Sequence, residues 1–168
     1  MGIVGLSVGQ SIALAMALER SCGEMRLADF DTLELSNLNR LKAGVTSLGL
    51  EKVVIAAREI SEIDPYLKLT LFREGITDGN IQEFFECNGK LDLLVDECDS
   101  LDIKVLLREK AKLAGIPVMM DTSDRGMLDI ERFDLEPERP IFHGMLKGIT
   151  KSELGNLCLL YTSDAADE

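Results

Sequence analysis

The sequence lacks several features that mark metal-clamped, disulfide-linked or nucleic-acid-binding proteins. Its 168 residues include four cysteines, and none of them forms a C-x-x-C pair. The spacing therefore predicts neither a zinc site of closely spaced thiolates nor a disulfide scaffold, and we expect free, buried thiols. Basic residues are also in the minority, because 18 Lys+Arg face 30 Asp+Glu and give a formal net charge of -12. Such a charge repels phosphate-rich surfaces, so neither nucleic acid nor a membrane is an expected partner.

No leader or membrane span is predicted either. The stretch from Gly2 to Leu18 is apolar, but Gln10 and Ser11 interrupt it and no basic segment precedes it. A spanning helix needs an uninterrupted apolar stretch, and a signal peptide needs a basic segment before its apolar one. We therefore expect a cytoplasmic protein. There are no repeats or low-complexity stretches, and a hydrophobic content of 46% supports one folded domain.

The two ends of the sequence indicate a fragment. The segment Cys158–Glu168 looks like a translated sequencing adapter, so we expect a domain over residues 1–157 and a non-native tail over 158–168. A natural acidic tail is the alternative. Only a few residues precede the turn at Gly5, which would leave the first strand short. We therefore expect a domain truncated at both ends, and inactive by itself.

Apolar runs alternate with helical patterns along most of the chain, which is typical of a parallel sheet with crossover helices. The prediction is a Rossmann-like, doubly wound α/β fold with a mainly parallel sheet and helices on both faces. Alternation of Leu67, Leu69 and Leu71 with polar residues predicts an edge strand or a half-solvated one. No regular alternation is recognised beyond Asp121. We predict strands at residues 3–4, 25–28, 67–71, 91–95 and 117–120, and helices at 11–20, 53–63, 81–85 and 101–114, the last burying Ile103, Leu106, Leu107 and Ala114.

A glycine-rich turn follows the first predicted strand and is the first candidate binding element. Its sequence is Gly-Leu-Ser-Val-Gly-Gln-Ser from Gly5 to Ser11, so Ser7 and Gln10 stand where a strict G-x-G-x-x-G pattern has glycine. Backbone N–H groups of Gly5, Ser7, Val8 and Gly9 would face a phosphate at the helix N-terminus. The Ser7 hydroxyl could also donate to that phosphate. A tight turn without a ligand is the alternative.

A polar segment follows the second predicted strand. Asp29 ends that strand, where a carboxylate can accept hydrogen bonds from an unphosphorylated ribose. Asp31 could assist, or simply form a turn. Ser36, Asn37 and Arg40 come next, and the Arg40 guanidinium could bind phosphate oxygens in a bidentate manner. A solvated loop is the alternative for this segment.

The order of these landmarks resembles the ThiF/MoeB family, the bacterial relatives of ubiquitin-activating enzymes. The similarity extends from about Gly2 to Met120 and includes Ser-Asn-Leu-Asn-Arg at residues 36–40 and the acidic segment at residues 96–100. The resemblance implies that Lys52 contacts the triphosphate of ATP, that Asp99 binds magnesium and that Ser100 lies beside it. Without it, Lys52 would be a surface lysine, and Asp99 or Ser100 a helix cap.

The resemblance also implies an activity. Family members use ATP and magnesium to adenylate the C-terminal glycine of a ubiquitin-like sulfur-carrier protein, and they form homodimers. Arg40, Lys52 and magnesium would align the reactants and neutralise phosphate charge, so no general base is needed. The segment 121–140 looks more like a MoeY-like branch with a downstream nitroreductase-like flavin domain. His143, the single histidine, is interpreted as structural.

Three functions remain open from the sequence. The first is an ATP-dependent adenylating domain, which Arg40, Lys52 and Asp99 favour. The second is a non-catalytic nucleotide- or NAD-binding module of a larger protein. The third is a scaffold with a relict site, for which the replacement of glycine by Ser7 would be an argument.

Overall fold

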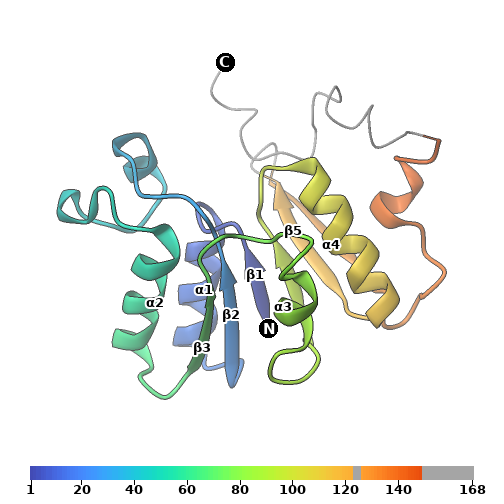
Figure 1. Ribbon diagram of the computed structural model, residues 1–168, viewed down its shortest axis with the longest axis horizontal. Coiled ribbons are helices and arrows are strands. Elements are labelled where there is room, and N and C mark those ends of the chain that lie inside the picture. Colours follow the sequence, from blue (N-terminus) through green and yellow to red (C-terminus); the bar gives the residue numbers. More distant parts are fainter. Residues whose placement is uncertain (123–125, 149–168) are drawn as a thin grey trace. The chain divides into compact units, whose positions relative to one another are not determined.

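The structure is a computed structural model that describes residues 1–122 and 126–148. The chain divides into two compact units, Met1–Lys90 and Leu91–Glu168 (Figure 1). The proposed tail at residues 158–168, with Cys158, lies outside the described residues.

The first unit is a three-stranded parallel sheet with crossover helices. The strand order is β3-β2-β1, with Ile3 opposite Leu27 and Leu27 opposite Leu71. Of the two alternatives predicted for this strand, the structure shows the edge position for β3. The elements in chain order are β1 (Gly2–Val4), α1 (Gly9–Leu18), β2 (Glu24–Ala28), α2 (Lys52–Ile63), β3 (Lys68–Phe72) and α3 (Ile81–Glu86).

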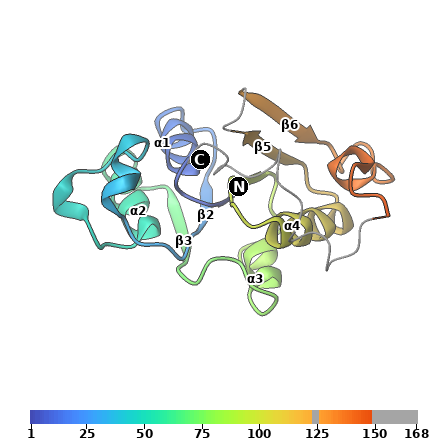
Figure 2. The ribbon, with the colours of Figure 1, turned by 90° about the horizontal axis from the view of Figure 1, so that it is seen from above.

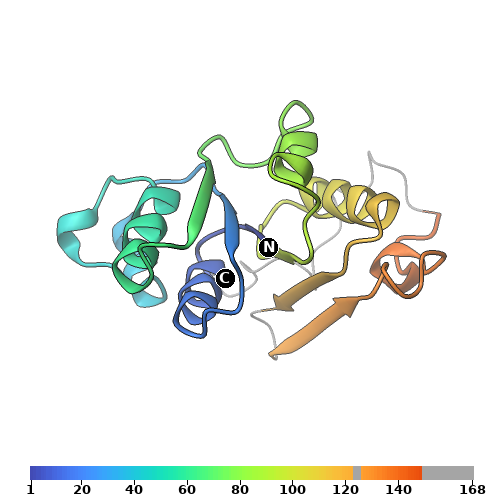
Figure 3. The ribbon, with the colours of Figure 1, turned by 90° about the horizontal axis from the view of Figure 1, so that it is seen from below.

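Helices cover both faces of this small sheet. Helix α1 packs against α2, and its small residues Ala13 and Ala17 are buried, which lets the two helices approach closely. Helix α3 lies on the opposite face, as Figure 3 shows. There the Arg26 guanidinium of β2 donates to the Phe84 carbonyl of α3 at 2.8 Å.

The polar segment between β2 and α2 folds back onto the unit. It contains the short 3-10 helices η1 (Leu35–Asn39) and η2 (Val45–Ser47). The Leu33 N–H donates to the Leu50 carbonyl at 2.8 Å. Leu33, Leu41 and Ile55 form a buried apolar cluster that anchors the segment on α2. These contacts hold the polar residues of the segment in place next to α2.

The second unit contains a mixed arrangement of three strands. Strand β4 (Leu94–Asp96) pairs in parallel with β5 (Val118–Thr122), and β5 pairs antiparallel with β6 (Met127–Glu131), as Figure 2 shows for the last two. Helix α4 (Leu101–Ala114) connects β4 to β5 and ends at Gly115, whose φ of 59° suits glycine. The 3-10 helix η3 (Ile141–Gly144) contacts α4 and β6.

The predicted Rossmann-like α/β fold is confirmed, with three details corrected. A strand does follow Asp121: β6 was missed because its buried face carries Asp129 and Glu131 while Leu128 and Ile130 are exposed. Such an inverted strand is recognised only when partners for its buried carboxylates are known.

The buried side of α4 also differs from the prediction. Leu107 is buried as expected. Ile103 and Leu106 are not among the buried residues of α4, whereas Lys104 and Arg108 are. The described cysteines are free, yet Cys87 is exposed rather than buried. No helix in the described ranges is both long and apolar enough to cross a membrane.

Candidate functional site

The glycine-rich turn of the first unit is fixed by the strand that follows it. Gly5 has a φ of 85°, a left-handed conformation that favours glycine, and its N–H donates to the Ala28 carbonyl at 2.9 Å. The next N–H, of Leu6, donates to Asp29 Oδ2 at 2.6 Å. The turn between β1 and α1 is therefore pinned to the end of β2.

Asp29 has a structural task that the sequence did not reveal. Its second oxygen, Oδ1, accepts the Asp31 N–H at 2.7 Å, so the carboxylate braces both the turn and its own loop. The residue is 8% exposed, and burial raises its pKa, although the N–H donors of Asp31 and Leu6 oppose that rise. A carboxylate offers about four acceptor sites, so capacity for a ribose hydroxyl remains.

Lys52 is the first residue of α2, and its ammonium group lies at the glycine-rich turn. Its Nζ is 3.0 Å from Ser7 Oγ and 2.8 Å from Asp31 Oδ2. The residue is only 4% exposed. The structure thus joins two predicted site residues, Ser7 and Lys52. It adds Asp31 as the partner that compensates the buried charge, a role that the sequence left undecided.

Backbone donors at the start of α1 remain without acceptors. Within residues 1–122 and 126–148, the N–H groups of Ser7, Val8 and Gly9 have no hydrogen-bond partner. They lie at the positive end of the helix dipole, beside the Lys52 ammonium that contacts Ser7. Such an arrangement binds anions, and phosphate is the usual one in this fold.

The segment at residues 36–40 mixes internal and exposed side chains. Asn37 is buried, and its Oδ1 accepts the Glu34 N–H at 2.9 Å, which stabilises the start of η1. Ser36 is exposed. Arg40 is also exposed, and its Nη1 donates to Asn39 Oδ1 at 3.2 Å. Contacts of these residues with a nucleotide stay predictions.

Gln10 is a residue that sequence reasoning missed. We noted it only as a departure from glycine, yet it is fully buried. Its Oε1 accepts the Lys42 N–H at 2.9 Å, and its Nε2 donates to the Lys42 carbonyl at 3.2 Å and to Glu59 Oε2 at 2.9 Å. Gln10 therefore ties α1 to the loop that follows Arg40 and to α2.

Asp99 and Ser100 belong to the second unit. Both are exposed, and they lie between the carboxyl end of β4 and the start of α4. Ser100 is the residue before the helix, and its carbonyl accepts the Lys104 N–H at 2.9 Å. The proximity of Asp99 to the glycine-rich turn stays a prediction from the fold class.

Comparison with known proteins assigns the family. The ThiF family matches residues 1–160. The chain belongs to the ThiF family. Its nucleotide-binding-type architecture and its glycine-rich turn are therefore those of an adenylyltransferase-like domain.

Individual relatives agree with this assignment. The uncharacterized protein MT1398 of Mycobacterium tuberculosis is 52% identical over 164 residues, which is 98% of this chain and 22% of that protein. The molybdopterin-synthase adenylyltransferase of Haemophilus influenzae is 25% identical over 148 residues, covering 88% of this chain and 58% of that enzyme. The chain thus spans less than two thirds of either relative.

A solved structure provides a third comparison. Escherichia coli tRNA N6-threonylcarbamoyladenosine dehydratase, crystallised with ATP, is 26% identical to this chain and superposes with a TM-score of 0.65. The match covers 76% of this chain and 52% of that one. The ATP is bound to the dehydratase in that crystal structure.

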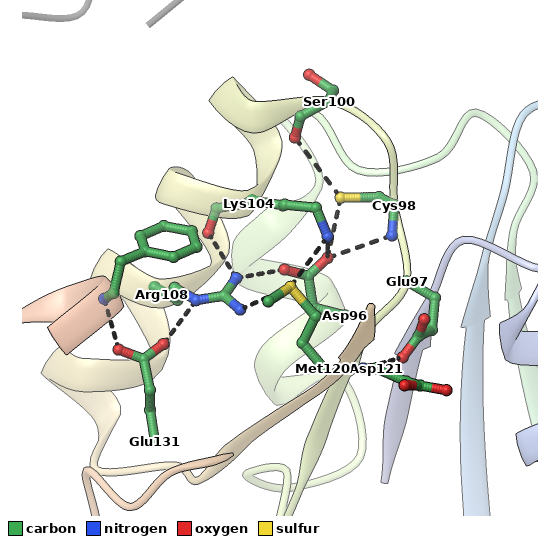
Figure 4. Close-up of polar contacts among 10 residues, drawn as sticks. Asp96, Glu97, Cys98, Ser100, Lys104, Arg108, Met120, Asp121 and Glu131 are labelled. Carbon is green, nitrogen blue, oxygen red and sulfur yellow. Dashed lines mark hydrogen bonds and ion pairs between the residues drawn. The ribbon is translucent and has the colours of Figure 1, made fainter. Parts of the chain in front are cut away.

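Behind Asp99, the ThiF domain contains a closed network of buried charges (Figure 4). The fully buried Asp96 at the end of β4 forms an ion pair with Arg108 of α4 and lies 3.5 Å from Lys104 Nζ. Arg108 Nε also donates to Glu131 Oε2 at 2.6 Å, and Glu131 Oε1 accepts the Phe142 N–H at 2.6 Å. The network therefore links β4, α4, β6 and η3.

The electrostatics of this network indicate a structural role. Burial by itself would raise the pKa of Asp96, but the positive charges of Lys104 and Arg108 outweigh it and lower that pKa. The Arg108 guanidinium also lies 4.1 Å from the centre of the Phe142 ring. Lys104 and Arg108 share a helical stripe with buried Leu101, but this spacing alone does not show that carboxylates compensate their charges.

The two residues that follow Asp96, Glu97 and Cys98, both have a raised pKa. Glu97 Oε1 accepts the Asp121 N–H at 2.9 Å, and burial raises the pKa of this carboxyl to about 7. The Cys98 thiol lies 3.0 Å from Asp96 Oδ1, and burial followed by the Asp96 charge raises its pKa well above the ordinary value. Cys98 is therefore a poor nucleophile, since the thiolate is the reactive form.

His143 is held between two charged side chains. Its Nε2 is 2.5 Å from Asp129 Oδ1, and its Nδ1 is 2.8 Å from Arg139 Nη2. Arginine can only donate, so Nδ1 accepts and Nε2 carries the proton toward Asp129. These contacts join η3 to β6, which agrees with the structural interpretation of His143.

Proposed function

We propose that this ThiF domain binds ATP with magnesium and activates a carboxylate by adenylation. The observation that carries the proposal is the position of Lys52, whose buried ammonium is held at Ser7 in the glycine-rich turn. A desolvated cation beside unpaired N–H groups suits a polyphosphate better than a neutral ligand. The family membership and the ATP bound in the related dehydratase support the same nucleotide.

In this reaction an acceptor carboxylate oxygen bonds to the α-phosphorus of ATP, and the bond to the leaving pyrophosphate breaks. The turn formed by Gly5, Ser7, Val8 and Gly9 would hold the phosphate chain, with Asp29 accepting a ribose hydroxyl. Ser36, Asn37 and Arg40 would line the nucleotide on the η1 side. Rate enhancement would come from alignment and from neutralised charge.

Magnesium would neutralise phosphate charge when bound, and the donor set fits this ion. No group of three or more acidic, histidine or cysteine side chains that could hold a metal by itself occurs in the described part of the chain. Magnesium is commonly held by one or two carboxylates together with phosphate oxygens and water. We propose Asp99 as that carboxylate, with Ser100 beside it.

The acceptor and the oligomeric state that we propose are those of a longer parent protein. By family likeness, the acceptor is the C-terminal glycine of a ubiquitin-like sulfur-carrier protein, and the parent is a cytoplasmic homodimer. The name of the Haemophilus relative, a molybdopterin-synthase adenylyltransferase, supports a protein acceptor. We further propose that the parent is MoeY-like and carries a nitroreductase-like domain downstream of this one.

Isothermal titration calorimetry of the chain with ATP, in the presence and absence of magnesium, tests this function. We expect ATP to bind more tightly than NAD and to depend on magnesium. Asp99→Ala should weaken magnesium-ATP about tenfold while leaving magnesium-free ATP within about twofold. Asp102→Ala, which removes another carboxylate from the first turn of α4, is the matched control. Equal affinity for NAD and ATP would contradict the proposal.

A non-catalytic nucleotide-binding module is the second candidate. Asp29 favours it, because a carboxylate at the end of β2 suits the ribose of NAD as well as that of ATP. Pyrophosphate exchange, measured on the longer parent protein with candidate carrier proteins, separates the two functions. Exchange supports adenylation, whereas tight ATP binding without exchange for any carrier supports the module.

A further inference from the structure

We propose that the Ser7 hydroxyl, positioned by Lys52, is a direct donor to the phosphate chain. Ser7 would then be a functional replacement for glycine in the turn. The inference rests on the proposed ATP-binding function and specifies which side chain contacts the phosphates.

The direction of the hydrogen bond between Lys52 and Ser7 is fixed by chemistry. An ammonium group has three donors and no acceptor, so at 3.0 Å the Ser7 Oγ must accept from Lys52 Nζ. The hydroxyl proton of Ser7 is therefore not used in this bond and can be donated elsewhere. No acceptor for it exists within residues 1–122 and 126–148, so this proton is available to a ligand.

The position of Lys52 is fixed from its other side by Asp31. The Lys52 Nζ lies 2.8 Å from Asp31 Oδ2, and the Lys52 N–H donates to the Asp31 carbonyl at 2.9 Å. Side-chain exposure is 5% for Lys52 and 46% for Asp31. The lysine is therefore a preorganised buried cation, whereas its partner can still be solvated.

The Lys52 ammonium strengthens any hydrogen bond that the Ser7 hydroxyl donates. The Ser7 oxygen accepts from a cation, which polarises its O–H bond and makes it a better donor. The same residue contributes a backbone N–H without a partner among the described residues, and so do Val8 and Gly9. A phosphate oxygen at the turn would thus receive the polarised hydroxyl and the backbone donors together.

Asp31 completes this arrangement as a positioning residue. It does not reach the turn directly, because its contacts are with Lys52 and with the Asp29 carboxylate that braces Leu6. The three side chains form one line of polar contacts, from the Asp31 carboxylate through the Lys52 ammonium to the Ser7 hydroxyl. A phosphate would be the acceptor at the end of that line.

Substitutions at position 7 give opposite signs for the two roles of this residue. If Ser7 were an impaired glycine, Ser7→Gly would restore the close backbone approach and tighten ATP binding. If the hydroxyl is the donor, both Ser7→Gly and Ser7→Ala should weaken ATP about tenfold to a hundredfold, the range for a charge-assisted hydrogen bond. Ser7→Thr, which keeps the hydroxyl, should recover most of the affinity.

The experiment is calorimetry on the chain with magnesium-ATP, sodium tripolyphosphate and adenosine. Loss of affinity in Ser7→Ala should appear with ATP and tripolyphosphate and be absent with adenosine. Ser61→Ala is the control, since that hydroxyl lies near the end of α2 and donates only to the Ala57 carbonyl.

The outcomes separate this inference from the proposed function. ATP binding by the wild-type chain that is unchanged or tightened in Ser7→Gly overturns the role of Ser7 and leaves the proposed function standing. Failure of the wild-type chain to bind ATP or tripolyphosphate overturns both. Thermal unfolding of each variant confirms that a lost affinity reflects a lost contact.

Discussion

The two units of this ThiF domain use the same chemical groups in opposite ways. In the first unit, Lys52 is held by Asp31 and Ser7, and the N–H donors around it still lack acceptors among the described residues. In the second unit, Arg108 is bound on both sides by carboxylates, Asp96 and Glu131. One arrangement is open to a further anion, and the other is complete.

The difference shows that burial of a charge does not identify a binding site. Lys52 and Arg108 are 4% and 1% exposed, so exposure does not distinguish them. What differs is the remaining bonding capacity of the neighbours. A saturated network stabilises the fold, whereas a cation next to unpaired donors is prepared for a ligand.

The largest expected effect comes from opening the saturated network. Arg108→Met removes the shared partner of Asp96 and Glu131 and leaves buried carboxylates without compensation. We expect the free energy of unfolding to fall by about 3–5 kcal/mol, measured by urea denaturation with circular dichroism. Arg108→Lys should lose less, because it keeps the charge but not the planar fork. A loss below about 1 kcal/mol would show that the network is not structural.

A smaller, pH-dependent effect is expected at Glu97. Its pKa is about 7 in the folded chain against an ordinary 4.5, so the folded state keeps a proton that the unfolded state has lost. Stability contributed by this group is therefore fully present below pH 4.5 and is lost as pH rises to about 7.

Glu97→Gln removes this titration while preserving an acceptor for the Asp121 N–H. Relative to wild type, the variant should gain up to about 3 kcal/mol in free energy of unfolding between acid and neutral pH. Urea denaturation at a series of pH values measures it, with the exposed Glu109→Gln as the control. Parallel stability curves for wild type and Glu97→Gln would contradict the raised pKa.

The smallest effect on stability is expected in the open site. The Arg40 side chain is exposed and, among the described residues, bonds only to Asn39. Arg40→Ala should therefore change the free energy of unfolding by less than about 0.5 kcal/mol. ATP affinity should nevertheless fall about tenfold, because a charged contact to phosphate is lost. Arg58→Ala, also exposed on α2, should change neither quantity. Unaltered ATP affinity in Arg40→Ala would remove this residue from the site.

Much of the fold could be predicted from local patterns. Alternating apolar and helical stretches predicted β1 to β5 and α1 to α4, since each pattern reflects which side chains must leave water. Strand β6 and the buried face of α4 could not, because their buried charges depend on partners in other elements. Lys104 pairs with Asp96, Arg108 with Asp96 and Glu131, and Asp129 with His143. A pairwise condition of this kind has no local signature.

The sequence by itself determined the Rossmann-like class, the glycine-rich turn and Asp29 as a binding candidate, and its family resemblance added Lys52. Only the tertiary structure decided that Asp29 braces the turn, that Gln10 fastens the loop after Arg40 and that Lys52 reaches Ser7. The physical reason is the range of the interactions. Burial is governed by side-chain type along each element, whereas the direction and saturation of hydrogen bonds depend on atoms tens of residues apart that meet only when the chain is folded.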